Sequence, residues 1–235
     1  MSQPASQSDL IEVRSWLSVW IRTGASPYGV ADLHVDYPPH GLFALRWLSV
    51  VPRPQMLAVF PWVNLLLTAL ASWQLVRWYS ELQDQPLTKA EAVGYLSMLL
   101  ASRAVRRMLL WGQTASFAIL LFALCMRLAA RRPTLAGICL GIASYKLNLA
   151  VGFGLALLLL GHWWTVLVGA GVAVGLTLAF AATIGQSVDV VAAQYVADFF
   201  NVYGGEQFLR GVTGLRAGLM ALVGDYSIVR LVYPA

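Results

Sequence analysis

The stretch GQTASFAILLFALCMRLAARRPTLAGICLGIASYKLN, residues 112–148, holds two apolar runs that flank a short loop rich in arginine. Three arginines lie between positions 127 and 132. Basic residues beside apolar runs are typical of loops on the cytoplasmic side of a membrane. If both runs cross the membrane, Gln113 and Lys146 therefore lie together on the extracytoplasmic side.

The composition of the whole chain favours a membrane protein. Of its 235 residues, 59% are hydrophobic and only 11% are charged, whereas soluble domains carry roughly a quarter charged residues. The formal net charge is +5, but the arginines lie at the ends of apolar runs. We therefore expect lipid phosphates and membrane lipids as partners, and no nucleic acid.

Metal and cofactor chemistry is not indicated by the sequence. Cys125 and Cys139 both lie in apolar stretches without a CxxC pattern, which is typical of packing residues. The three histidines are scattered and lack HExxH spacing. We expect no cofactor and no protein-bound metal site, and the sequence leaves a divalent-metal requirement open.

Several further apolar segments indicate membrane-spanning helices. A span needs about 20 residues, a length reached by the segments 56–78 and 163–184 and approached by 114–130. The segment 134–161 fits either one tilted span that contains Lys146 or two half-length helices that meet near it. The first apolar run, 41–51, is too short to span alone.

The spacing near the N-terminus predicts a surface helix over residues 9–22. Apolar residues recur there every three or four positions, with charged residues between them. Trp16 and Trp20 lie on the apolar side, which suits a helix in the lipid headgroup zone.

These patterns predict an all-α, multi-pass transmembrane helical bundle with an N-terminal interfacial amphipathic helix. We expect one membrane domain over residues 1–235 in the cell membrane. Residues 1–37 would form an extracytoplasmic loop with the interfacial helix, and 38–184 the transmembrane helices. Residues 185–235 would form a polar loop and a final weak apolar segment. How many early segments cross is open, so the sequence does not settle whether the N-terminal region joins Gln113 and Lys146.

Two acids near the N-terminus are candidates for chemistry. Asp9 is well placed to cap a helix, with Glu12 completing a capping-box-like pair; it could also serve as a general base at the membrane surface. Asp36 precedes Tyr37 and two prolines. The prolines fit the start of a helix, and the acid complements the helix dipole.

Two polar positions flank the arginine-rich loop at a distance. Gln113 could form a hydrogen bond between helices or face a polar substrate cavity. Lys146 could extend its amine to the membrane interface or hold a lipid phosphate as a point charge. Arg106 and Arg107, just before Gln113, could serve likewise.

Together these features resemble a known family. The acid-bearing helix, SPYGVADLHVDYPPHGLFAL at 26–45 and the stretch 112–164 resemble the GT-C superfamily of integral-membrane glycosyltransferases. The sequence is most similar to glycosyltransferase family 87, the polyprenyl-phosphate-mannose-dependent mannosyltransferases. The likeness covers most of residues 9–184, and the chain looks shortened at both ends.

The resemblance implies an inverting transfer of a hexose, with mannose expected, from a polyprenyl-phosphate-sugar donor to a lipid or glycan acceptor. It implies an active site on the extracytoplasmic side with a loop aspartate as general base, Asp9 first and Asp36 in reserve. The expected substrate-binding residues are Glu12, Arg14, Tyr37, Arg107, Gln113 and Lys146. Two alternatives remain open: a non-catalytic module that binds polyprenyl lipid, and a small transporter of lipids or solutes.

Overall fold

Every element of the computed structural model, among the residues that it describes, is a helix. Those residues are 8–30, 33, 35–82 and 87–203, and no strand occurs within them. The all-α prediction is therefore confirmed. The predicted weak apolar segment at 212–223 lies outside the described residues.

The chain forms ten α-helices and one 3₁₀ helix over this described part. In order they are α1 Ser8–Thr23, α2 Pro39–Leu45, η1 Arg46–Ser49, α3 Arg53–Leu82, α4 Lys89–Leu100, α5 Arg103–Trp111, α6 Ala115–Leu128, α7 Pro133–Ala143, α8 Leu147–Leu159, α9 Trp163–Thr183 and α10 Val188–Tyr203.

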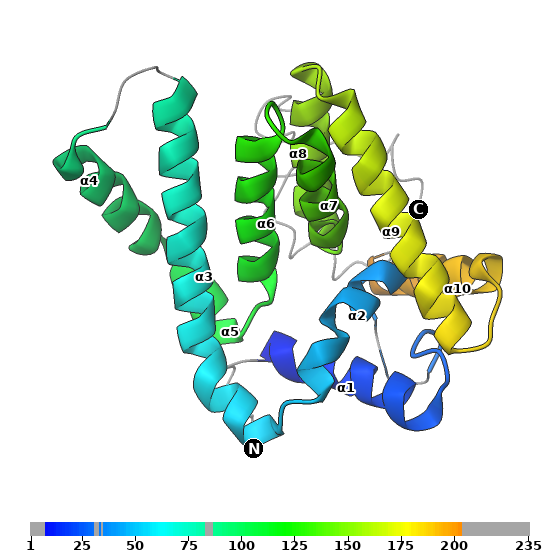
Figure 1. The fold of residues 1–235 in the computed structure, drawn as a ribbon. Coiled ribbons are helices and arrows are strands. Elements are labelled where there is room, and N and C mark those ends of the chain that lie inside the picture. The colour runs from blue at the N-terminus through cyan, green and yellow to red at the C-terminus, as the bar shows by residue number, and fades with distance from the viewer. Residues whose placement is uncertain (1–7, 31–32, 34, 83–86, 204–235) are drawn as a thin grey trace, which may run out of the picture.

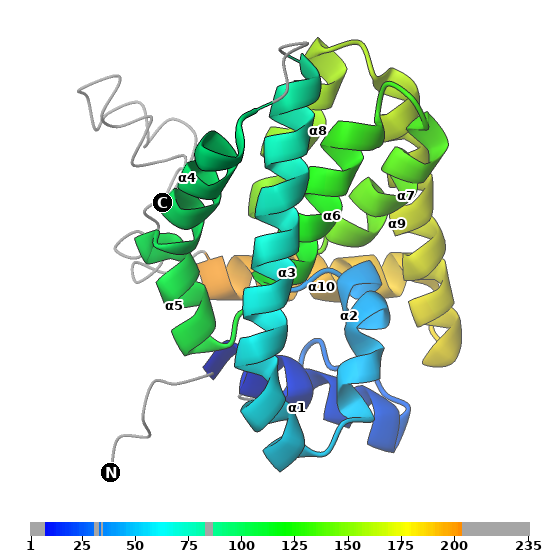
Figure 2. The ribbon, with the colours of Figure 1, turned by 60° about the vertical axis from the view of Figure 1, so that its left-hand side comes forward.

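The helices form an upright bundle that is closed at one end by helices running across it. Helices α3, α6, α7, α8 and α9 stand side by side, while α1 and α10 lie across the same end together with the short α2 (Figures 1 and 2). The most extensive packing joins α7 to α9, α3 to α6 and α6 to α7. Helices α4 and α5 lie beside α3.

The arginine-rich loop lies at the opposite end of the bundle from α1. Arg127 donates hydrogen bonds to Gln74 and Glu81 near the end of α3, and Arg131 lies 3.5 Å from the same Glu81 carboxylate. Helices α6 and α7 run in opposite directions on either side of this loop (Figure 1). Thr114 and Tyr145 consequently meet at the other end, where the Tyr145 hydroxyl donates to the Thr114 carbonyl at 2.6 Å. The N-terminal region, α1 and α2, packs at that same end.

The segment 134–161 forms two short helices that meet near Lys146, the second of the two alternatives that the sequence left open. Helix α7 ends at Ala143, and α8 begins at Leu147. Lys146 lies between them with non-helical backbone angles, φ −92° and ψ 78°. The lysine is thus held at a turn.

Within the described part of the chain, two helices, α3 and α9, are long and apolar enough to cross a membrane. The sequence predicted more crossings, but α6 has 14 residues and, at 1.5 Å per residue, reaches about 21 Å, short of the roughly 30 Å of a hydrocarbon core. Helices α7 and α8 are also apolar and short. Large apolar side chains are exposed on α3, α8 and α9, among them Trp62, Leu159 and Leu167.

The N-terminal helix forms where the spacing predicts it, but its apolar side has a different partner. Trp16 and Trp20 are buried, at 4% and 5% exposure, so the prediction that they face lipid headgroups is wrong. Trp20 contacts Phe180 of α9 edge-on and donates to the Thr183 hydroxyl. The amphipathic side of α1 closes the bundle because helices of the same chain cover it.

A second correction concerns residues 188–203. The sequence predicted a polar loop after residue 185, whereas the structure has α10 there. Val191 and Asp198 are buried, and Tyr195 lies on the same side of the helix because residues three and four apart share a face. Alternating small, polar and aromatic residues hid this face from the hydropathy pattern.

Glycines allow α7 to lie against α9. A Cβ added to Gly141 would come within 2.5 Å of the Gly169 carbonyl oxygen and 2.6 Å of the Val172 Cβ, closer than real Cβ atoms approach. The backbones therefore pack directly, as small residues permit between apolar helices.

We predict that Gly141→Ala weakens this packing by about 1–3 kcal/mol, the usual cost of overfilling a tight core. The check is a thermal unfolding curve of the purified protein in detergent. Gly171→Ala on α9 is the matched control, since nothing lies within 4 Å of its added Cβ. Equal midpoints for the two variants would contradict the close contact of α7 and α9.

Candidate functional site

Tyr37 lies at the end of the bundle where α1 and α2 meet two helix junctions, the one between α5 and α6 and the one between α7 and α8. Its side chain is 4% exposed, and its hydroxyl lies 2.8 Å from the Thr114 hydroxyl. The rings of Trp16 and Tyr145 lie 5.3 and 5.5 Å from its ring. The Lys146 amine lies 4.4 Å from the centre of the Tyr37 ring, within the range of a cation–π contact.

Two further tyrosines fix the backbone around Tyr37. The Tyr28 hydroxyl donates to the Tyr37 carbonyl at 2.7 Å, and Tyr145 bonds the Thr114 carbonyl. Both rings are buried, where each hydrogen bond also satisfies groups that would be costly to leave without a partner. The segment 28–37 is thereby tied to the ends of α6 and α7.

The short helix α2 follows this segment and fits closely against Tyr145. Pro39 stands at its first turn, as the pair of prolines predicts. A Cβ on Gly41 would lie 2.4 Å from the Tyr145 Cβ, so only glycine allows this approach. His40, on the same helix, lies 2.9 Å from the Ser144 hydroxyl. The DYPP stretch thus leads the chain onto the α7–α8 junction.

Three carboxylates act on this site electrostatically. Partial burial raises the pKa of Glu12, and the charges of Asp9 and then Asp36 raise it further. Burial also raises the pKa of Tyr37, and Asp36, Asp9 and Glu12 all add to that rise. Like charges interact this way only over short distances. The charges of Asp9, Glu12 and Asp36 therefore all act on Tyr37.

The amine of Lys146 is the cation of this group. Among the described residues, both salt bridges belong to Arg127 and Arg131, so Lys146 is held by the aromatic ring and not by a carboxylate. An amine fixed this way keeps its charge available for an anionic ligand.

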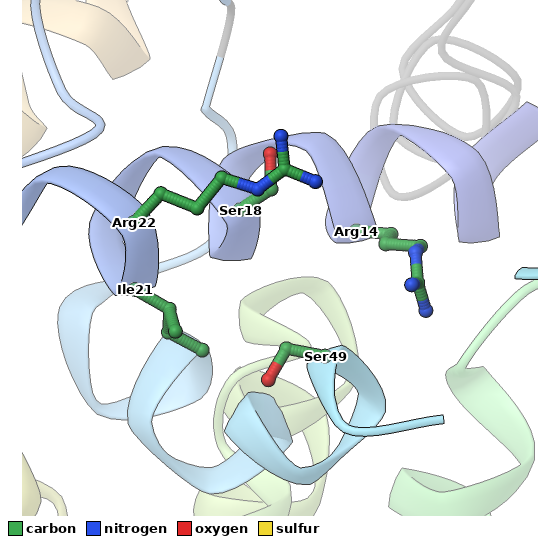
Figure 3. Close-up of a pocket in the computed structure, with 5 residues that line it drawn as sticks. All are labelled: Arg14, Ser18, Ile21, Arg22 and Ser49. Atoms are coloured by element: carbon green, nitrogen blue, oxygen red, sulfur yellow. The ribbon is translucent and has the colours of Figure 1, made fainter. Parts of the chain in front are cut away.

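Arg14 lies elsewhere, on the side of α1 that faces η1. Its guanidinium donates hydrogen bonds to the backbone carbonyls of Leu48, at 3.2 Å, and Val51. These bonds give partners to carbonyl groups at the end of the 3₁₀ helix. With Ser18, Ile21, Arg22 and Ser49 it lines a pocket of about 80 Å³ (Figure 3). The residues predicted to bind substrate therefore do not form one cluster: Arg14 lies at η1, away from Tyr37 and Lys146.

The remaining predicted residues contribute less directly. Gln113 stands between α5 and α6, where its backbone carbonyl accepts a hydrogen bond from the Asn64 side-chain amide at 3.1 Å. Gly112 before it has φ +63°, the left-handed turn that favours glycine at a helix end. The side chain of Arg107 lies outside the described part of the structure.

Sequence reasoning missed the residues that hold the site together. Thr114 and Tyr145 stand next to the predicted Gln113 and Lys146, and both are buried. Tyr28 lies in the stretch 26–45 that carries the resemblance, but it is not among the predicted site residues. The available signal was a set of aromatic and hydroxyl residues beside each polar candidate.

No group of three or more histidine, cysteine, aspartate or glutamate side chains that could hold a metal ion occurs among the described residues.

Asp9 lies in the first turn of α1, since the helix begins at Ser8. Its charge there complements the positive end of the helix, but the N-cap position predicted for Asp9 lies before Ser8, so Asp9 is a first-turn residue and not the cap.

Comparison with known proteins gives one match. The family model described as Glycosyltransferase family 87 matches residues 35–233. No curated protein and no solved structure matches the chain. The matched range includes Asp36, Tyr37, Thr114 and Lys146 and confirms the resemblance to this family, while Asp9, Glu12 and Arg14 lie before it.

We predict that Glu12→Gln stabilises the protein at neutral pH. The pKa of Glu12 in the folded protein lies above its ordinary value of 4.5, so folding loses stability as the pH rises through that interval. The gain should be about a few tenths of a kcal/mol, because the side chain reaches solvent. Unfolding curves at several pH values provide the measurement, and the difference from wild type should vanish below the ordinary pKa.

Glu91→Gln is the control of opposite sign for this experiment. The Glu91 carboxylate accepts two hydrogen bonds from Thr88, and these lower its pKa. Its replacement should cause a small loss of stability at neutral pH. A destabilising Glu12→Gln at pH 7 would contradict the mutual repulsion of the three acids.

Proposed function

Because this chain belongs to glycosyltransferase family 87, we propose that it is a polyprenyl-phosphate-dependent hexosyltransferase. It transfers mannose, with inversion, from a polyprenyl-phosphate-sugar donor to a lipid or glycan acceptor. The observation that carries this proposal is the Lys146 amine on the ring of Tyr37, a residue on which the charges of Asp9, Glu12 and Asp36 also act. A fixed cation and nearby carboxylate charges are the groups that such a transfer needs.

The Lys146 amine binds the phosphate of the donor lipid. During transfer the bond between the anomeric carbon and the phosphate oxygen breaks, and the polyprenyl phosphate leaves with the electron pair. A fixed positive charge beside that oxygen stabilises the developing negative charge. The Tyr37 ring keeps the amine at one place.

Asp9 acts as the general base in this proposal, with Asp36 as the alternative. The base removes the proton of the acceptor hydroxyl while the hydroxyl oxygen attacks the anomeric carbon from the side opposite the phosphate. The charges of Asp9 and Asp36 reach Glu12 and raise its pKa, so the general base stands within a group of carboxylates that repel one another.

The membrane setting follows from the apolar helices. Helices α3 and α9 cross the bilayer, and the shorter α6, α7 and α8 complete a multi-pass bundle between them. The arginine-rich loop then faces the cytoplasm, which puts Tyr37 and its neighbours at the extracytoplasmic surface of the cell membrane. A donor whose sugar lies at the surface and whose chain lies in lipid fits this position.

We predict that Asp9→Asn lowers the turnover of the purified protein by at least about a hundredfold, because the amide cannot accept the proton. The measurement is transfer of radiolabelled mannose from polyprenyl phosphate mannose to an acceptor in a membrane extract. Asp189→Asn on the exposed start of α10 is the control and should keep full activity.

The same assay separates the alternatives. Loss of turnover in Asp36→Asn alone would move the general base to Asp36. Donor binding without transfer by the wild-type protein would instead identify a non-catalytic lipid-binding module.

We predict that Lys146→Met raises the KM for the donor by about tenfold to a hundredfold, the range expected for a lost charged hydrogen bond. Lys146→Arg keeps the charge and should recover most of the affinity. Steady-state kinetics over a series of donor concentrations give the result. An unchanged KM in Lys146→Met would remove this lysine from the phosphate site.

A further inference from the structure

Helix α10 is fixed against the segment that carries the acids. The Gly29 amide donates to the Asp198 carboxylate at 3.1 Å. The ring of Tyr195 meets the ring of Tyr28 edge-on, 5.7 Å away. Since the Tyr28 hydroxyl bonds the Tyr37 carbonyl, α10 forms a wall beside Asp36 and Tyr37.

The Tyr195 hydroxyl is buried on this wall without a hydrogen-bond partner among the residues that the structure describes. The side-chain oxygen of the preceding residue, Gln194, is also buried without a hydrogen-bond partner among these residues. Buried polar groups in proteins are nearly always hydrogen-bonded, and an exception calls for an explanation. A ligand that supplies the missing partner is one such explanation.

The charge around Tyr195 selects the kind of ligand. Burial and then the charge of Asp36 raise the pKa of Tyr195 to about 12, so the phenol stays protonated at neutral pH and can donate a hydrogen bond. The nearby carboxylate disfavours a phosphate. A neutral hydroxyl suits both groups, since it can accept from the phenol and donate to the carboxylate.

We propose that the Tyr195 hydroxyl donates a hydrogen bond to a hydroxyl oxygen of the hexose on the donor lipid, which makes α10 the sugar-recognising wall of the site. This inference rests on the proposed function for the identity of the lipid. The phosphate lies at Lys146, and the sugar extends from it toward Asp36 and α10. The ring of Tyr195, which is only partly buried, offers apolar surface to the sugar's C–H groups.

Tyr195→Phe tests the proposal because it removes one oxygen and keeps the ring. The contacts of the ring with Tyr28 and Phe199 remain, so the variant should fold with an unchanged unfolding midpoint. Its dissociation constants are measured in detergent for two probes, polyprenyl phosphate mannose and polyprenyl phosphate without a sugar. Tyr95→Phe, which removes an exposed phenol oxygen on α4, is the matched control.

We expect the wild-type protein to bind the mannose-bearing lipid more tightly than the bare lipid. Tyr195→Phe should weaken binding of the mannose-bearing lipid about fivefold to tenfold, the effect of one neutral hydrogen bond, and leave the bare lipid unaffected. Equal wild-type affinity for both probes, or a Tyr195→Phe variant that keeps the sugar preference, overturns the inference.

The binding measurement also keeps this inference separate from the transferase proposal. If the wild-type protein transfers no mannose but shows a sugar preference that depends on Tyr195, the enzymatic proposal fails and the sugar contact stands. If transfer occurs and Tyr195→Phe binds both probes like the wild-type protein, the opposite conclusion holds.

Discussion

The buried hydrogen bond between the hydroxyls of Tyr37 and Thr114 is the contact on which the arrangement of this molecule depends. It joins the N-terminal segment to the start of α6, and Tyr145 joins the same threonine to the end of α7. A buried polar pair is satisfied in one register only, and breaking it leaves both oxygens without partners. The α6–α7 hairpin, the turn at Lys146 and the acid-bearing segment are therefore held in one place by local chemistry.

The electrostatics around Tyr37 are unfavourable for stability and useful for transfer. The charges of Asp9 and Asp36 raise the pKa of Glu12, and this repulsion costs folding free energy at neutral pH. A lysine held by a ring face and not by a carboxylate keeps a charge that a salt bridge would have neutralised. Strongly perturbed groups gathered at one place are characteristic of functional sites, and membership of a glycosyltransferase family gives this arrangement its interpretation.

Part of this structure could be predicted from the sequence because it follows from local patterns. Periodicity gave α1, hydropathy gave α3 and α9, and the arginine-rich loop placed Gln113 and Lys146 at one end. Other features depend on contacts between distant residues, which a single sequence does not reveal. The burial of Trp16 and Trp20 is set by the covering helices. Helix α10 packs through a face too mixed in composition to show in the hydropathy pattern, and Thr114 gains its role from a tyrosine 77 positions away.

The most direct test of the central claim, that the lysine and the acids around Tyr37 form one donor site, is a structure of the protein with polyprenyl phosphate mannose bound. The phosphate should lie within hydrogen-bond distance of the Lys146 amine, and the sugar should lie between that amine and the carboxylates of Asp9 and Asp36. A phosphate bound instead in the pocket lined by Arg14 and Arg22, with no ligand atom in contact with Lys146, would contradict this claim.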